Sequence, residues 1–193
     1  MATGREADEV RRRLTGDRVV LRGPVVSDVD DRWAAGFDPE VVRLQGGEPS
    51  EFSEPMTRAW AERWYERMMA DENPWAWMIE YDGHHVGTAR LYNHVPIDRK
   101  ASYAVGLNSS ALFGQGLGTE VTRLVLDFAF TSEPDGAGLH RVELRVLDFN
   151  RRGVGCYRRC GFVDEGRERE AAFVDGDWRD YLVMGVLETD PRG

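Results

Sequence analysis

The sequence predicts a mixed α/β fold in a single domain. A chain of 193 residues is long enough for one domain with a substantial core. Its segments run in the order one strand, two helices, three strands, helix, strand, helix and two strands. No internal repeat or long linker divides them. We therefore place the domain at residues 15–189 and expect residues 1–14 to form a mobile N-terminal extension.

The first strand and helix are predicted by local patterns. Residues 18–22 alternate polar and apolar side chains, as a half-buried strand does. Ser27, followed by Asp28 and Asp30, is typical of a helix start, because a serine side chain caps free N–H groups and early acids complement the helix dipole. We expect this helix to end near Gly36.

A loop and a second helix are predicted next. Residues 38–54 are rich in Gly, Pro and Glu, which favours a loop. Residues 55–70 form the second predicted helix. Its apolar side chains recur every four residues, which favours a core face over the lining of a substrate cleft. They are Met56, Trp60, Trp64 and Met68.

The middle of the chain predicts three strands. Residues 75–81 and 85–94 flank Asp82-Gly83, and this dipeptide between two strand-like runs is a strong hairpin signal. A third strand covers residues 101–107 and leads into a glycine-rich stretch. The remaining elements are a helix over 116–130, a strand over 140–147, a helix over 150–160 and two strands joined by a hairpin around Asp175-Gly176.

The glycine-rich stretch indicates a phosphate site. Gly114, Gly116 and Gly118 alternate between a predicted strand and a predicted helix. Glycines there let several N–H groups point at one anion, and the helix dipole adds partial positive charge. A P-loop would need a lysine after the last glycine, and a dinucleotide fingerprint would need a different spacing in an early parallel unit.

Several motifs together resemble the GNAT superfamily of N-acetyltransferases. The glycine stretch at 114–120 resembles its pyrophosphate loop, residues 139–146 and 150–162 its fifth strand and following helix, and residues 173–180 its terminal hairpin. The nearest patterns are those of ribosomal-protein N-terminal acetyltransferases and bacterial spermidine acetyltransferase. The resemblance covers residues 17–187. It implies a mostly antiparallel central sheet, splayed between its fourth and fifth strands, with helices on both faces.

The resemblance also implies a binding site for acetyl-CoA as co-substrate. Main-chain groups of Val105, Gly106 and Leu107 would pair with the pantetheine amides, and Asn150 would contact the pantetheine arm. Tyr157 would protonate the leaving thiolate. The pyrophosphate would be held by main-chain N–H groups of Gly114, Gln115, Gly116, Leu117, Gly118 and Thr119.

The sequence departs from this family where a base is expected. Ser102 and Arg145 occupy positions where relatives carry carboxylates, and Phe113 replaces a polar residue that often opens the loop. The base that deprotonates the amine therefore stays open. It is Glu80, His94, Glu143 or water. The neighbouring arginines either meet the CoA 3′-phosphate or form a solvent-exposed face; they are Arg151, Arg152, Arg158 and Arg159.

Composition narrows the partners. The chain has 34 acidic and 25 basic residues and a net charge of −9, which disfavours nucleic acid and suits a cationic amine. No apolar run reaches the ~20 residues of a membrane span, and no secretory signal is seen, so we expect a cytoplasmic protein. Cys156 and Cys160 lack further ligands for a metal.

The sequence supports three functional hypotheses. The first is an enzyme that acetylates a small cationic amine, such as a polyamine or an antibiotic. The second is an enzyme that acetylates a protein N-terminus or lysine. The third is a module that binds acyl-CoA as a sensor without turnover. The resemblance also allows a homodimer, and the length of the acyl group stays open.

Overall fold

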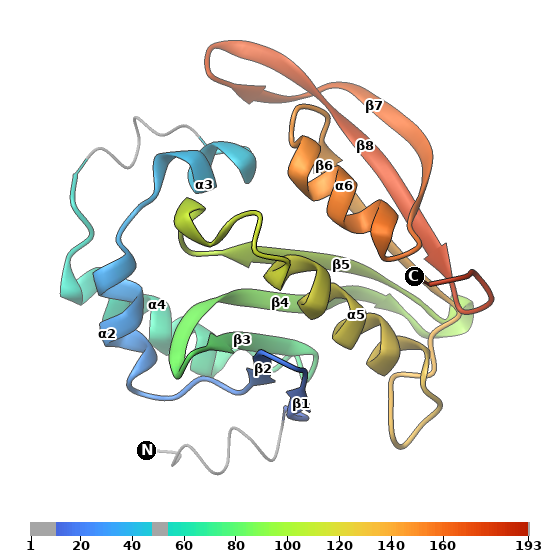
Figure 1. Cartoon of the computed structure of the whole chain (residues 1–193), viewed down its shortest axis with the longest axis horizontal. Helices are drawn as coiled ribbons and strands as arrows, with labels where there is room; N and C mark the ends of the chain where they lie inside the picture. The colour runs from blue at the N-terminus through green and yellow to red at the C-terminus, as the bar shows by residue number, and fades with distance from the viewer. Residues whose placement is uncertain (1–10, 48–53, 193) are drawn as a thin grey trace.

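The computed structural model describes residues 11–47 and 54–192. Within them, eight strands form one sheet in the order β1-β2-β3-β4-β5-β6-β8-β7 (Figure 1). The strands are β1 Leu14–Thr15, β2 Val19–Arg22, β3 Ala76–Tyr81, β4 His84–Val95, β5 Lys100–Leu107, β6 Arg141–Leu147, β7 Val163–Val174 and β8 Asp177–Leu187. The helices are α2 Asp28–Ala35, α3 Pro39–Leu44, α4 Arg58–Ala70, α5 Leu117–Phe130 and α6 Arg151–Arg159, with 3-10 turns η2 Pro96–Asp98 and η3 Ser110–Leu112.

The sheet splays open between β5 and β6. These two strands are parallel and pair only at Lys100↔Arg141, Ala101↔Val142 and Ser102↔Glu143. The other neighbouring strands are antiparallel. Beyond Ser102, β5 keeps its pairing with β4 but pairs with no described strand on its other edge, so main-chain groups there are free to bind a ligand. The predicted mixed fold and its splayed sheet are confirmed.

Helices cover both faces of the sheet (Figure 1). Helix α5 packs on β1, β2, β5 and β6, and it buries an apolar stripe that includes Val121, Val125 and Ala129. On the other face, α2 packs on α4 and β4. The main core lies beneath α5, where side chains such as Trp77 and Leu91 are fully buried. Burial of this apolar surface holds α5 against the sheet.

The β3–β4 hairpin forms as predicted. Asp82 and Gly83 have φ angles of 53° and 79°, the left-handed values that a two-residue turn between twisted strands requires. The register shifts between Ile79 and Glu80, where Ile79 pairs with Gly87 and Glu80 with His85. The extra residue turns the His85 ring toward α4, where it packs 5.2 Å from Trp64.

The segment between β2 and α4 differs from the prediction in three ways. Ser27 makes no side-chain cap; instead, the Asp28 carboxylate accepts from the Val25 N–H at 2.9 Å. Part of the predicted loop is helix α3, because Asp38 accepts from two N–H groups of its first turn and Pro39 follows it. The second predicted helix begins only at Arg58. Residues 48–53 lie outside the described residues.

The predicted N-terminal extension is described from residue 11 onward. Arg11 is buried and donates to the carbonyl oxygens of Met68 and Asp71 at the end of α4. Leu14 belongs to β1 and pairs with Leu21. Residues 11–14 therefore dock on the domain, while residues 1–10 lie outside the described part of the chain.

Candidate active site

A cavity of about 1060 Å³ occupies the opening between β5 and β6. The free end of β5, the start of α5, helix α3 and helix α6 form its walls. Ten of the eleven predicted site residues line it: Val105, Gly106, Leu107, Gly114, Gly116, Leu117, Gly118, Thr119, Asn150 and Tyr157. The eleventh, Gln115, turns its side chain away and donates to the Ala111 carbonyl at 3.0 Å.

The glycine-rich loop presents a row of unused donors. Gly114 and Gly116 have φ angles of 77° and 84°, which favour glycine strongly. Among the described residues, the main-chain N–H groups from Gly114 to Gly118 have no acceptor. The Thr119 N–H differs from the prediction, because it donates to the Gly116 carbonyl at 3.0 Å. The cradle of N–H groups at the start of α5 suits a phosphate.

Glu120 fixes this loop to the sheet. Its carboxylate accepts from the Arg18 N–H at 2.7 Å, the Val19 N–H at 3.1 Å and Arg18 Nε at 3.0 Å. Burial raises the pKa of Glu120, but these hydrogen bonds outweigh it and hold the pKa below its ordinary value. Arg18 also donates to the Gln115 carbonyl at 2.9 Å. Sequence reasoning missed this brace, since the two residues are far apart in the chain.

The cavity is locally rich in positive charge although the chain is acidic. Five arginines line it against three acids, Asp17, Glu120 and Asp127. The arginines are Arg18, Arg123, Arg151, Arg152 and Arg159. Arg158, which was also a predicted phosphate contact, does not line the cavity and pairs with Asp164 at 2.6 Å.

Three of these arginines are available to a ligand. Within residues 11–47 and 54–192, Arg123, Arg151 and Arg159 form no ion pair. Arg152 is 3.8 Å from Glu40 and lies 5.7 Å above the Phe113 ring. A cavity with an N–H cradle and unpaired guanidinium groups is suited to a ligand with several phosphates.

Asn150 caps helix α6, in addition to its predicted contact with pantetheine. Its Oδ1 accepts from the Gly153 N–H at 2.9 Å and caps α6. A Cβ on Gly153 would lie 2.8 Å from Asn150 Nδ2, so a larger residue there would displace the Asn150 side chain. The Nδ2 group is what remains free to meet a ligand in the cavity.

Tyr157 lies on α6 and is held by aromatic neighbours. Its ring meets Tyr103 edge-on at 6.4 Å and Phe162 at 5.8 Å. Burial raises the pKa of Tyr157 above its ordinary value, with smaller contributions from nearby Cys156 and Cys160. The phenol therefore stays protonated at neutral pH and can donate a hydrogen bond inside the cavity.

The three predicted bases do not line this cavity. Glu80 pairs with Arg22 at 2.5 Å, and Glu143 pairs with Arg141 at 3.2 Å. His94 is exposed and packs 4.7 Å from the Trp75 ring. These contacts give each of the three groups a structural role.

A smaller cavity of about 460 Å³ lies beside the first. The two cavities share four lining residues, Val41, Gln45, Gly106 and Leu107. Its other walls come from the α2–α3 segment, α4 and the residue after β5. Apart from the shared Gly106 and Leu107, the sequence singled out only Trp60 and Trp64 of this site, through the apolar stripe. The rest comes from segments that are distant in sequence, and part of it from α3, which was predicted as loop.

Two further observations concern metals and membranes. In the described residues, no group of three or more His, Cys, Asp and Glu side chains is placed to hold a metal ion. No helix in that part of the chain is long and apolar enough to cross a bilayer.

Comparison with known proteins gives the family. Residues 18–163 match the acetyltransferase (GNAT) domain family. The spermidine N(1)-acetyltransferase of Escherichia coli K12 is 26% identical over 124 residues, which cover 64% of each chain. A putative ribosomal N-acetyltransferase of Bacillus subtilis, YdaF, is 26% identical over 129 residues, covering 67% of this chain and 68% of the other.

A solved structure shows the same fold. The spermidine N-acetyltransferase of Vibrio cholerae, in complex with CoA and spermine, aligns with a TM-score of 0.70 and 22% identity, covering 89% of this chain and 96% of that one. The chain belongs to the GNAT acetyltransferase family. The predicted resemblance, including the two nearest patterns, is confirmed.

Proposed function

We propose that this protein is an N-acetyltransferase that moves the acetyl group of acetyl-CoA to the primary amine of a small molecule. The observation that carries the proposal is the cavity between β5 and β6. It joins a free strand edge, a cradle of N–H groups at the start of α5 and a buried phenol. Family membership and the relatives named as acetyltransferases support it.

The residues divide the binding of acetyl-CoA among them. The free edge of β5 at Val105, Gly106 and Leu107 pairs with the amides of pantetheine, and Asn150 Nδ2 adds a donor. The N–H groups from Gly114 to Gly118 bind the pyrophosphate, and the dipole of α5 strengthens this contact. Arg123, Arg151 and Arg159 surround the remaining phosphate.

Tyr157 acts on the leaving group. In the reaction the amine nitrogen forms a bond to the acetyl carbon, the carbon–sulfur bond breaks, and one proton passes in net from the amine to the sulfur. The raised pKa keeps Tyr157 protonated at neutral pH, so its O–H is present to give a proton to the developing thiolate and then regains the amine's proton through water. Water fits the accepting role, because Glu80, His94 and Glu143 line neither cavity.

The acceptor expected from the net charge is a cationic amine, such as a polyamine. The chain's charge of −9 and the relatives named for spermidine support it. The unpaired guanidinium of Arg32 in the second cavity gives a different expectation. The panel of acceptors in the test therefore has to include amines of both kinds.

Release of free thiol from acetyl-CoA tests the proposal. The purified chain is incubated with acetyl-CoA and a panel of polyamines, aminoglycosides, amino acids and short peptides, and thiol is followed by a colorimetric reagent. We expect release with small amines. Tyr157→Phe should lower kcat by about 10²–10⁴-fold and leave CoA affinity unchanged, as general acid catalysis predicts. Tyr81→Phe, on β3 and away from both cavities, is the control.

The same experiment separates an enzyme from a sensor. Tight CoA binding without release from any acceptor would contradict the proposal and favour a module that binds acyl-CoA without turnover. Release with peptides alone would favour a protein acetyltransferase.

A further inference from the structure

Arg32 brings an unpaired positive charge to the second cavity. Its Nη1 donates to the Gly36 carbonyl at 2.6 Å, and its guanidinium lies 5.7 Å from the Phe37 ring centre and 5.2 Å from that of Trp60. Burial lowers the pKa of Arg32 to about 10, so the group is still charged at neutral pH. Across residues 11–47 and 54–192, no carboxylate pairs with it.

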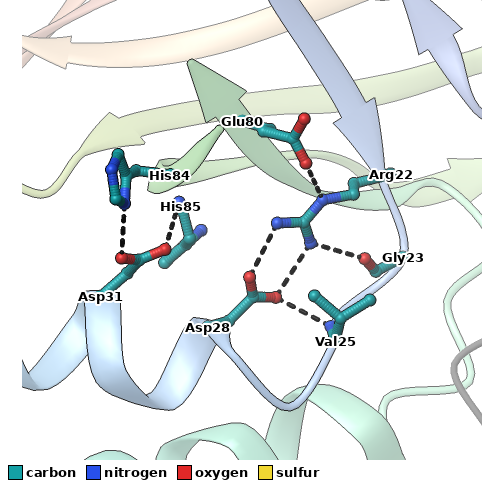
Figure 2. A network of polar contacts seen from close by, with 8 residues as sticks. All are labelled: Arg22, Gly23, Val25, Asp28, Asp31, Glu80, His84 and His85. Carbon is teal, nitrogen blue, oxygen red and sulfur yellow. Dashed lines mark hydrogen bonds and ion pairs between the residues drawn. The ribbon is translucent and has the colours of Figure 1, made fainter. Parts of the chain in front are cut away.

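The three acidic side chains of α2, the helix that carries Arg32, all form contacts with other residues. Figure 2 shows that Asp28 turns to Arg22 and that Asp31 turns to the imidazole of His84 and the main chain of His85. Asp28 is 2.8 Å from Arg22 Nη2, and the Asp31 oxygens are 2.9 Å from His84 Nδ1 and 2.7 Å from the His85 nitrogen. The third acid, Asp30, pairs with Arg58 at 2.5 Å.

Asp38, the one acid among the described residues that line the second cavity, already accepts hydrogen bonds from its neighbours. Asp38 accepts four hydrogen bonds: from the Ser110 N–H at 2.6 Å, the Ser110 hydroxyl at 2.7 Å, the Glu40 N–H at 3.0 Å and the Val41 N–H at 3.2 Å. A carboxylate filled by these local donors has no lone pair left for a ligand's ammonium group.

An amide donor in the same wall has no partner within the described part of the chain. Asn108 follows β5 and lines the cavity, and its buried Nδ2 makes no hydrogen bond to any residue of 11–47 or 54–192. The cavity therefore contains a charged donor and a neutral donor that both await an acceptor. An unpaired buried donor is costly, so an oxyanion that satisfied both would gain more than an uncharged group of the same size.

We propose that the second cavity binds the acceptor, and that this acceptor is an amine carrying a carboxylate, held by Arg32 and Asn108. The inference rests on the proposed function and names its substrate class. A cavity of about 460 Å³ suits a small molecule. Gly106 and Leu107 belong to both cavities, so an amine can extend along this edge of β5 toward the thioester while its carboxylate stays at Arg32. The aliphatic part packs on Trp60 and Trp64.

This placement makes Arg32 a specificity-determining residue. A second ammonium group at the same place would meet a guanidinium and, among the described residues, no free carboxylate, so a polyamine is disfavoured there. The net charge of −9 describes the whole chain and does not set the local field in this cavity.

Three acceptors that differ at one end test the inference. They are 4-aminobutyrate, n-butylamine and 1,4-diaminobutane, which carry a carboxylate, a methyl group and an ammonium group. Thiol release should give a kcat/KM for 4-aminobutyrate about 10- to 100-fold above the other two, the range expected for a hydrogen-bonded charge pair. Arg32→Gln should bring the three values close together, and Arg32→Lys should keep part of the preference. Arg63→Gln, on α4 and outside the cavity, should keep all of it.

A second readout does not depend on turnover. Binding of 4-aminobutyrate should change the tryptophan fluorescence of the CoA-saturated protein, because Trp60 and Trp64 line the cavity. The change should be absent with n-butylamine and in Arg32→Gln.

The outcomes separate the inference from the proposed function. A preference for 1,4-diaminobutane, equal rates for all three amines, or an unchanged preference in Arg32→Gln overturns the inference while the enzyme stands. A preference for 2-aminoethyl phosphate over 4-aminobutyrate overturns the assignment of a carboxylate. If no amine releases thiol, the proposed function fails, and the fluorescence titration alone decides whether Arg32 binds a carboxylate.

Discussion

The buried ion pair between Arg22 and Asp28 anchors helix α2 and offers a sharp test of the structure. The side chains are 6% and 0% exposed, and Asp28 also accepts from the Val25 N–H. Breaking such a pair from one side costs about 3–5 kcal/mol. Glu80, 2.5 Å from Arg22 Nε, still neutralises the arginine, so we expect Asp28→Asn to cost about 3 kcal/mol, the lower end of that range. For a domain of this size the melting temperature should fall by about 6–12 °C.

Urea unfolding at pH 7, followed by tryptophan fluorescence, measures this cost. The matched control is Asp30→Asn on the same helix. Asp30 is 65% exposed and pairs with Arg58, which is 48% exposed. Solvent screens an exposed ion pair, so the control should leave the free energy of unfolding nearly unchanged. A cost for Asp28→Asn no larger than that of Asp30→Asn would refute the reasoning.

Three further predictions concern the loop, a thiol and an acid. Gly116→Ala should lower the free energy of unfolding by about 1–2 kcal/mol and weaken CoA binding, because φ is 84° there. The control Gly166→Ala, with open space around it, should do neither. Equal effects of the two substitutions would contradict the prediction. The neighbouring Cys160 thiol and the Thr119 hydroxyl lower the pKa of Cys156, so its alkylation should level off at a lower pH than that of a free thiol and be blocked by CoA; acceleration that continues to pH 9 would argue otherwise. Burial raises the pKa of Asp38, but hydrogen bonds led by those from Ser110 outweigh it and keep the pKa low. Its stabilisation is present above the unfolded pKa of about 3.9 and is lost as pH falls through the folded value, so Asp38→Asn should cost more in urea unfolding at pH 7 than at pH 3.

The elements that sequence predicted well carry their signals locally. Asp82-Gly83 adopts the left-handed angles of a tight hairpin, and the alternating glycines do lie between a strand and a helix start. Helix α3 was missed because it has only six residues and glycines follow it. Its signal was Asp38 before Pro39, a cap and a first-turn proline.

The cap of α2 shows how a tertiary contact overrides a local pattern. Ser27 stands where a capping serine is expected, yet its side chain makes no cap. Asp28 is instead held by Arg22 and accepts from the Val25 N–H. Only the folding of β2 against α2 brings Arg22 into contact with Asp28, and no spacing in the sequence predicts this contact.

The two halves of the candidate site differ in how well the sequence predicts them. The donor half would bind acetyl-CoA, and the proposed acceptor half would bind the amine. The donor half lies on β5, the loop before α5 and the start of α6, so motifs within about 55 residues of each other predicted it. The acceptor half is assembled from α2, the α2–α3 segment, α4 and Asn108. The sequence did not indicate a role for Arg32. Only the structure shows that its guanidinium has no carboxylate partner among the described residues.

Amide hydrogen exchange of residues 114–118 tests the central claim most directly. The N–H groups from Gly114 to Gly118 have no acceptor among the described residues and would gain one from the CoA pyrophosphate. We expect saturating CoA to slow exchange at these amides and at those on the free edge of β5. We expect no change at the β3–β4 hairpin. CoA binding that leaves residues 114–118 exchanging as fast as in the free protein would contradict the proposed pyrophosphate site.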